Sequence, residues 1–79
     1  REPLPFDGNP QAQAALGITG RELDVLRELA EGRSNKEIGR RLGISHETVK
    51  THLARLYERL GARGRAEAVL LARELGLIP

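Results

Sequence analysis

Two segments, each opened by a serine and closed by a glycine, constrain the fold of this chain more than any other feature. Ser34 and Glu37 stand three residues apart. This is the spacing of a capping box, in which the serine oxygen accepts from a backbone N–H at the start of a helix. Gly43 ends the first segment, because glycine takes the left-handed conformation beyond a helix without steric cost. Ser45 then opens a second segment, which Gly61 closes.

The apolar residues of both segments repeat at helical spacing. Ile38 and Leu42 share one face of the first segment. An inner stripe runs along the second segment at Val49, Leu53, Leu56 and Leu60. The pattern predicts helices over residues 35–42 and 46–60, joined by a tight turn in which Ile44 is an apolar plug. Helix, three-residue turn and helix is the layout of the helix-turn-helix motif, whose second helix enters the DNA major groove.

Positive charge is concentrated in the same part of the chain. Residues 33–65 contain nine basic and three acidic residues, a net charge of +6, whereas the whole chain has a formal net charge of +2. A surface that faces DNA phosphates requires such a concentration. The competing interpretation is a solvated helical surface with many salt bridges.

A further helix is expected on each side of this pair. Thr19 and Glu22 have the spacing of another capping box and predict a helix over 20–31. The negative charge of Glu22 is favourable near the positive N-terminus of this helix, and its carboxylate can also pair with an arginine of a later helix. The last helix is expected over 65–75, after a start at Gly64 that lacks a side-chain cap. Its inner face would contain Ala68, Val69, Ala72 and Leu75, widened by Leu70 and Leu71, with Leu77 and Ile78 folding back on it.

The first seventeen residues contain three of the four prolines and no long apolar face. Asn9, Pro10 and Gly17 carry the cap signals of one or two helical turns. We therefore expect a flexible or short-helical linker or tail over 1–17, followed by an all-α, four-helix bundle-like domain over 18–79. Whether the first part joins another domain or is only a disordered tail stays open at this point.

Composition disfavours several other functions. The chain has no cysteine and only two histidines, so we expect no disulfide, no metal site and no cofactor. No apolar run is long enough for a transmembrane helix, and no signal peptide is evident, which suits a cytoplasmic protein. His52 is better explained as a packed or phosphate-contacting residue than as a metal ligand. The sequence also lacks a nucleophile–base pair or paired carboxylates, so an enzyme is not expected.

Eight short segments occur in a characteristic order and spacing, namely Ile18-Thr-Gly-Arg-Glu22, Val25-Leu26, Leu29-Ala-Glu-Gly32, Ser34-Asn-Lys-Glu-Ile38, Ile44-Ser45, Thr48-Val-Lys-Thr-His52, Leu60-Gly61 and Arg65-Ala-Glu-Ala-Val69. Taken together, these segments resemble the LuxR/NarL-type C-terminal DNA-binding domain. The resemblance covers residues 18–78. The sequence departs from the family pattern at Gly20, where proline is usual, at Gly39, where alanine is usual, and at the uncapped Gly64.

The resemblance and the helical geometry together imply three sets of site residues. Base contacts are expected on the outer side of the helix over 46–60, at Glu47, Lys50, Thr51 and Ala54. Phosphate contacts are expected at Ser34, Asn35, Lys36, Ser45, Thr48 and Arg55. In this family the last helix supplies the dimer contact, which implies Val69, Leu70, Arg73 and Leu77. The alternative is that the additional leucines, Leu70 and Leu71, pack against the helix over 20–31 within a monomer.

The resulting hypothesis is the DNA-binding output domain of a transcription regulator of the response-regulator or LuxR type. Its partner would be double-stranded DNA, bound by a weak homodimer that forms on an inverted repeat, with RNA polymerase as a further candidate partner. A sigma-factor region-four-like module is the alternative, although the helix after Gly61 favours the first hypothesis. A protein-interaction module on the same scaffold is a third, and it predicts DNA affinity no better than that of a generic basic protein.

Overall fold

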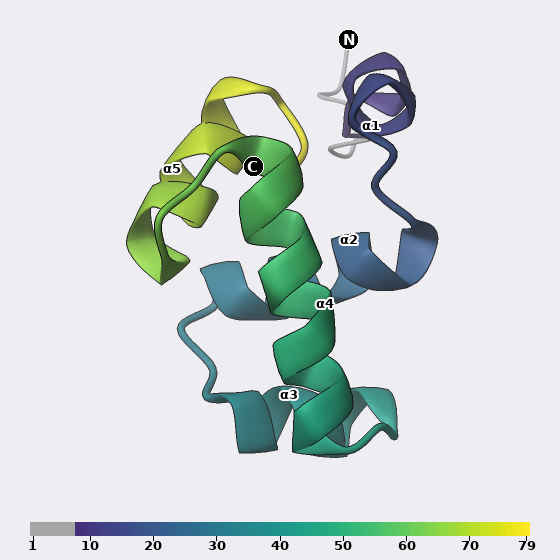
Figure 1. Cartoon of the computed structure of the whole chain (residues 1–79), viewed down its shortest axis with the longest axis vertical. Helices are drawn as coiled ribbons and strands as arrows, with labels where there is room; N and C mark the ends of the chain where they lie inside the picture. Colours follow the sequence, from purple (N-terminus) through teal and green to yellow (C-terminus); the bar gives the residue numbers. More distant parts are fainter. Residues whose placement is uncertain (1–7) are drawn as a thin grey trace, which may run out of the picture.

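The computed structural model describes residues 8–79, and in that range it contains five helices and no strand (Figure 1). The all-α expectation is confirmed. The second and third of the four main helices begin and end at the expected residues, and the first and fourth each end one residue early. Residues 1–7 of the expected linker lie outside the described residues. The helices are α1 (Pro10–Leu16), α2 (Gly20–Ala30), α3 (Asn35–Leu42), α4 (His46–Leu60) and α5 (Arg65–Glu74).

The longest helix, α4, is the element on which the others pack. It contacts α2, α3 and α5. Figure 1 shows α3 crossing near the start of α4, and α5 lying near its end. None of the described helices combines the length and the apolar character that crossing a bilayer requires. The arrangement leaves one side of α4 uncovered, and that side contains the candidate site.

Both predicted capping boxes are present. In the second, the Ser34 hydroxyl accepts from the Glu37 N–H (3.2 Å), and the Glu37 carboxylate accepts from the Ser34 N–H (2.9 Å). The hydrogen bond from the Ser34 N–H is the largest cause that lowers the pKa of the Glu37 carboxyl below its ordinary value, and the Ser34 hydroxyl lowers this pKa further. The ionised Glu37 carboxylate therefore stabilises the fold at pH values above its ordinary pKa. This contribution is lost as the pH falls through the lowered pKa of the folded chain.

The first capping box is joined to a buried ion pair. Glu22 is 1% exposed, accepts from the Thr19 N–H (3.0 Å), and forms an ion pair with Arg59 in the last turn of α4. The expectation that Glu22 pairs with an arginine of a later helix is therefore confirmed. The pair ties the start of α2 to the end of α4, which are 37 residues apart in sequence.

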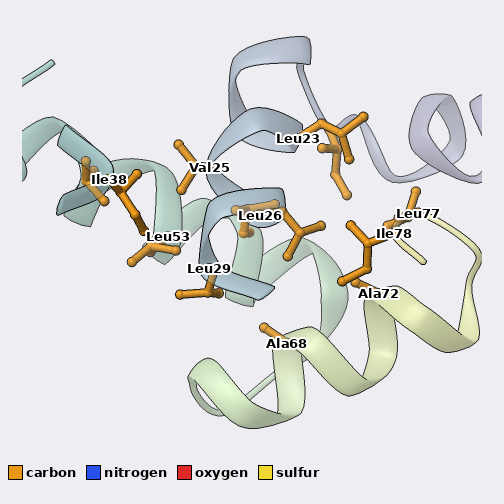
Figure 2. Packing of buried hydrophobic residues seen from close by; sticks show 13 residues of the cluster. Leu23, Val25, Leu26, Leu29, Ile38, Leu53, Ala68, Ala72, Leu77 and Ile78 are labelled. Atoms are coloured by element: carbon orange, nitrogen blue, oxygen red, sulfur yellow. The ribbon is translucent and has the colours of Figure 1, made fainter. Parts of the chain in front are cut away.

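The core is closed at one end by the C-terminal residues (Figure 2). Ala68 and Ala72 of α5 are fully buried, as expected, and Leu77 and Ile78 fold back onto the same core. Leu75 was expected on the inner face but is 37% exposed. The reason is that α5 ends at Glu74 and the chain reverses at Gly76 (φ +73°), so Leu77 and Ile78 fill the space instead.

The short helix α1, for which cap signals were noted, is present and packs on the rest of the domain. Asn9 caps it by accepting from the Ala12 N–H (3.1 Å), and the same side chain donates to the carbonyl of Leu75 (2.9 Å). Ala12 and Leu16 pack against the core. Part of the segment expected as a linker is therefore docked beside the C-terminal end of α5.

Candidate DNA-binding interface

The turn between α3 and α4 packs tightly against α3. Gly43 adopts the left-handed conformation (φ +70°), and the Ile44 N–H donates to the Gly39 carbonyl (2.9 Å). A Cβ atom at residue 39 would lie 2.6 Å from the Ile44 carbonyl oxygen, so the backbone of the turn occupies the space of a side chain. Glycine at this position is thus explained by packing, and the close approach sets how α4 leaves α3.

The two sides of α4 differ as the helical spacing predicts. Val49, Leu53 and Leu56 are buried in the core. The residues expected to contact bases are all exposed and, because they recur with the period of the helix, share the opposite side of it; they are Glu47, Lys50, Thr51 and Ala54. This side provides a carboxylate, an ammonium group and two methyl groups, and base edges are read by such groups.

The polar groups on this side interact with one another in the unbound chain. Glu47 lies 3.2 Å from His46 Nε2 and 3.9 Å from Lys50 Nζ. The Thr51 hydroxyl donates to the Glu47 carbonyl (3.2 Å) within the helix. The hydroxyl of Thr51 is therefore occupied, while its methyl group remains for contact with a partner.

The expected phosphate contacts fall into two groups. The hydroxyls of Ser34, Ser45 and Thr48 are engaged at helix starts: Ser34 Oγ accepts from the Glu37 N–H, and Ser45 Oγ accepts from the Thr48 N–H (3.1 Å) and lies 2.9 Å from the Thr48 hydroxyl. Lys36 and Arg55 are exposed and form no ion pair with another described residue. The two cations are thus available to an anionic partner, whereas the hydroxyls of Ser34 and Ser45 cap α3 and α4 and that of Thr48 is bonded to Ser45.

Ion pairs reduce the number of basic side chains that are available to phosphates. Arg33 and Arg41 both pair with Glu28, with Arg33 Nε 3.2 Å from Glu28 Oε2 but outside hydrogen-bond geometry. Arg59 and Arg63 pair with Glu22 and Glu67, and Lys50 lies near Glu47. Of the nine basic residues in the 33–65 stretch, four have no carboxylate partner among residues 8–79, namely Lys36, Arg40, Arg55 and Arg65.

Arg65 contacts the expected site but was not singled out by the sequence reasoning. It begins α5, and its guanidinium donates to the Arg33 carbonyl (2.8 Å) and to the Asn35 side-chain oxygen (3.0 Å). Asn35 was expected to contact phosphate, and the structure adds that its oxygen is already bonded. No local pattern signals this bridge, because the two residues are 30 positions apart in sequence.

The residues expected at a dimer contact differ in exposure. Leu70 is 56% exposed, Arg73 is exposed, and Val69 is half-buried against the core. Leu77 is only 1% exposed and packs within the core of the single chain. Its inclusion in the dimer contact is therefore not supported by the fold, because the reversal at Gly76 turns it inward.

The family of the chain follows from comparison with known proteins. A model of the bacterial regulatory proteins of the luxR family matches residues 17–72. The nitrate/nitrite response regulator protein NarP of Escherichia coli (strain K12) is 52% identical over 54 residues, which are 68% of this chain and 25% of that protein. The uncharacterized transcriptional regulatory protein YhcZ of Bacillus subtilis (strain 168) is 44% identical over 69 residues, 87% of this chain and 32% of that protein.

A third relative is the transcriptional regulatory protein LiaR of Bacillus subtilis (strain 168), 41% identical over 61 residues, which are 77% of this chain and 29% of that protein. The chain therefore covers at most 32% of the length of each of these three relatives. The family match covers more than half of the chain and contains the whole helix-turn-helix. The chain belongs to the luxR family of bacterial regulatory proteins, and its helix-turn-helix is that of a DNA-binding transcription regulator.

Proposed function

We propose that this chain is the sequence-specific DNA-binding domain of a longer transcription regulator, and that α4 reads bases in the major groove. The observation that carries the proposal is the exposed side of α4 with Glu47, Lys50, Thr51 and Ala54. Lysine donates to guanine, glutamate accepts from cytosine N4, and a threonine methyl can meet a thymine methyl. Lys36 and Arg55, which are exposed and have no carboxylate partner among residues 8–79, would hold the DNA backbone.

The rest of the regulator is proposed from the relatives. NarP is named a nitrate/nitrite response regulator, and YhcZ a transcriptional regulatory protein. By analogy, residues 1–17 would join residues 18–79 to an input domain, the regulator would act in the cytoplasm, and RNA polymerase would be a further partner.

Selection of bound duplexes from a random DNA pool tests the central proposal. We expect one enriched motif, repeated as an inverted pair with half-site centres about one helical turn, roughly 34 Å, apart. The matched control is Arg27→Ala, which removes an exposed cation from α2, outside the helix-turn-helix, and should select the same motif. If the chain binds DNA but no motif is enriched, it binds only as a generic basic protein does, and this result would contradict sequence-specific reading.

The Lys36→Ala variant tests the expected contact between Lys36 and a DNA phosphate. Lys36 is exposed in the first turn of α3 and has no ion-pair partner among the described residues. Its loss should weaken binding to all duplexes alike and lower the slope of log K against log salt by about one. Titrations at several salt concentrations measure this slope, with Arg27→Ala as the charge-matched control. An unchanged slope would remove Lys36 from the phosphate contacts.

A weak dimer that forms on DNA is the last part of the proposal. The candidate face on α5 contains Leu70, Arg73 and part of Val69, a smaller surface than the roughly 1,200 Å² that stable interfaces usually bury. Two copies on adjacent half-sites would nevertheless have a high effective concentration. We therefore expect a monomer in solution that pairs on an inverted repeat.

The Leu70→Asp variant tests this dimer. Because Leu70 is 56% exposed, the variant should remain folded, bind a single half-site normally and lose cooperativity on the full site. Sedimentation with each duplex measures the stoichiometry, and thermal unfolding checks the fold. If cooperativity persists in a folded variant, the dimer face lies elsewhere on the domain.

A further inference from the structure

Arg65 connects two parts of the domain that are distant in sequence. From the first turn of α5, it reaches the start of α3, where it donates to the carbonyl of Arg33, just before the helix (2.8 Å), and to the side-chain oxygen of Asn35, the first residue of the helix (3.0 Å). Both acceptors are neutral, and Arg65 forms no ion pair within residues 8–79. The guanidinium is thus held in a defined place by hydrogen bonds and not by a carboxylate.

The chemistry of this contact fixes the orientation of the Asn35 amide. A guanidinium can only donate, so the amide must present its oxygen Oδ1 to Arg65. The amide nitrogen Nδ2 consequently faces away from Arg65 with its two N–H groups. The planar guanidinium reaches both acceptors at once with two separate nitrogens, which a lysine ammonium on a flexible stem would not reproduce.

The position of the Asn35 amide is beside the proposed reading side of α4. Asn35 and Arg65 line one shallow hollow with Lys50, Ala54 and Tyr57. Lys50 and Ala54 are two of the four proposed base contacts, so a DNA strand lying against α4 would pass close to this hollow. A neutral N–H donor at such a place is a common type of phosphate contact.

We propose that Arg65 is a positioning residue for DNA binding: it holds the Asn35 amide so that Nδ2 donates to a backbone phosphate. The inference rests on the proposed function and adds a residue that acts through another residue. Arg65 also hydrogen-bonds the start of α5, the helix proposed to form the dimer, directly to Asn35, one of the proposed phosphate contacts.

The test compares four forms of the 79-residue chain: the wild type, Arg65→Lys, Asn35→Ala and the double variant. Arg65→Lys keeps the charge but loses the fixed bridge. We expect each single variant to weaken binding roughly tenfold, on the selected duplex and on an unrelated duplex alike, as for a lost hydrogen bond to a charged group. The double variant should bind no more weakly than Asn35→Ala, and the salt slope should be unchanged in all forms.

Other results would overturn the inference. If Arg65→Lys binds like the wild type, charge alone matters at this position. If the two losses multiply in the double variant, Arg65 acts independently of Asn35. A fifth form, Arg65→Ala, removes the charge as well as the bridge, and if it lowers the salt slope by about one, Arg65 contacts a phosphate itself. A wild-type chain that binds no duplex would instead refute the proposed function.

A measurement on the wild type keeps the inference testable even where a variant fails to fold. The side-chain amide protons of Asn35 give their own nuclear magnetic resonance signals, and a hydrogen bond to phosphate should shift both signals when the selected duplex is added. The amide signals of Gln13, which bonds to the Ile18 carbonyl (3.1 Å) away from the helix-turn-helix, are the control and should not move. Unmoved Asn35 signals at saturation would overturn the proposal.

Discussion

Replacing Glu22 by alanine should lower the free energy of unfolding by about 3 kcal/mol, the low end of the range for breaking a buried ion pair. Glu22 is 1% exposed, and its carboxylate serves both Arg59 and the Thr19 N–H. The low end applies because the Arg59 side chain is 34% exposed and can turn toward water after the substitution. A domain of this size has a total stability of roughly 4–12 kcal/mol, so the loss is a large share.

Glu37→Ala is the matched control for this prediction. Glu37 closes the same kind of capping box with Ser34, but it is exposed and forms no ion pair with a described residue. Glu37→Ala should therefore lower the free energy of unfolding by much less than Glu22→Ala. Urea unfolding followed by circular dichroism measures both variants. Equal losses would mean that the Glu22–Arg59 pair adds nothing beyond the cap, and that the stability of the α2–α4 contact comes from apolar packing alone.

The ends of the helices could be predicted from sequence because their signals are local. Ser34, Ser45 and Thr19 each accept a backbone N–H of their own first turn, and Gly43 and Gly61 take the left-handed conformation after the last turn. Such interactions span three or four residues, so spacing alone identifies them. The exposed side of α4 could be predicted for the same reason, since helical periodicity assigns its faces.

Features that depend on distant contacts could not be predicted in this way. The sequence suggested that Glu22 pairs with an arginine, but the choice of Arg59 depends on how α2 crosses α4. The helical period placed Leu75 inside, yet the turn at Gly76 brought Leu77 into that space. The contact between Arg65 and Asn35 likewise follows from where α5 begins relative to α3.

Lys50→Ala should change sequence preference more than it changes overall affinity. Lys50 is exposed on the proposed reading side of α4, and its nearest carboxylate, on Glu47, is 3.9 Å away. Such a contact is weak in water, so the ammonium group can leave it for guanine O6 and N7. The loss should be about 1–3 kcal/mol on the selected duplex and less on random DNA. Thr51→Ala should act in the same direction through its methyl group.

Lys36→Ala provides the comparison that separates reading from anchoring, because it removes the same kind of side chain from the same motif. Competition titrations give, for each variant, the ratio of affinity for the selected duplex to affinity for random DNA. Lys50→Ala should lower this ratio, whereas Lys36→Ala should lower both affinities and leave the ratio unchanged. An unchanged ratio for Lys50→Ala would assign this lysine to the DNA backbone. Base reading would then depend on Glu47 and Thr51, because Ala54 offers only a methyl group.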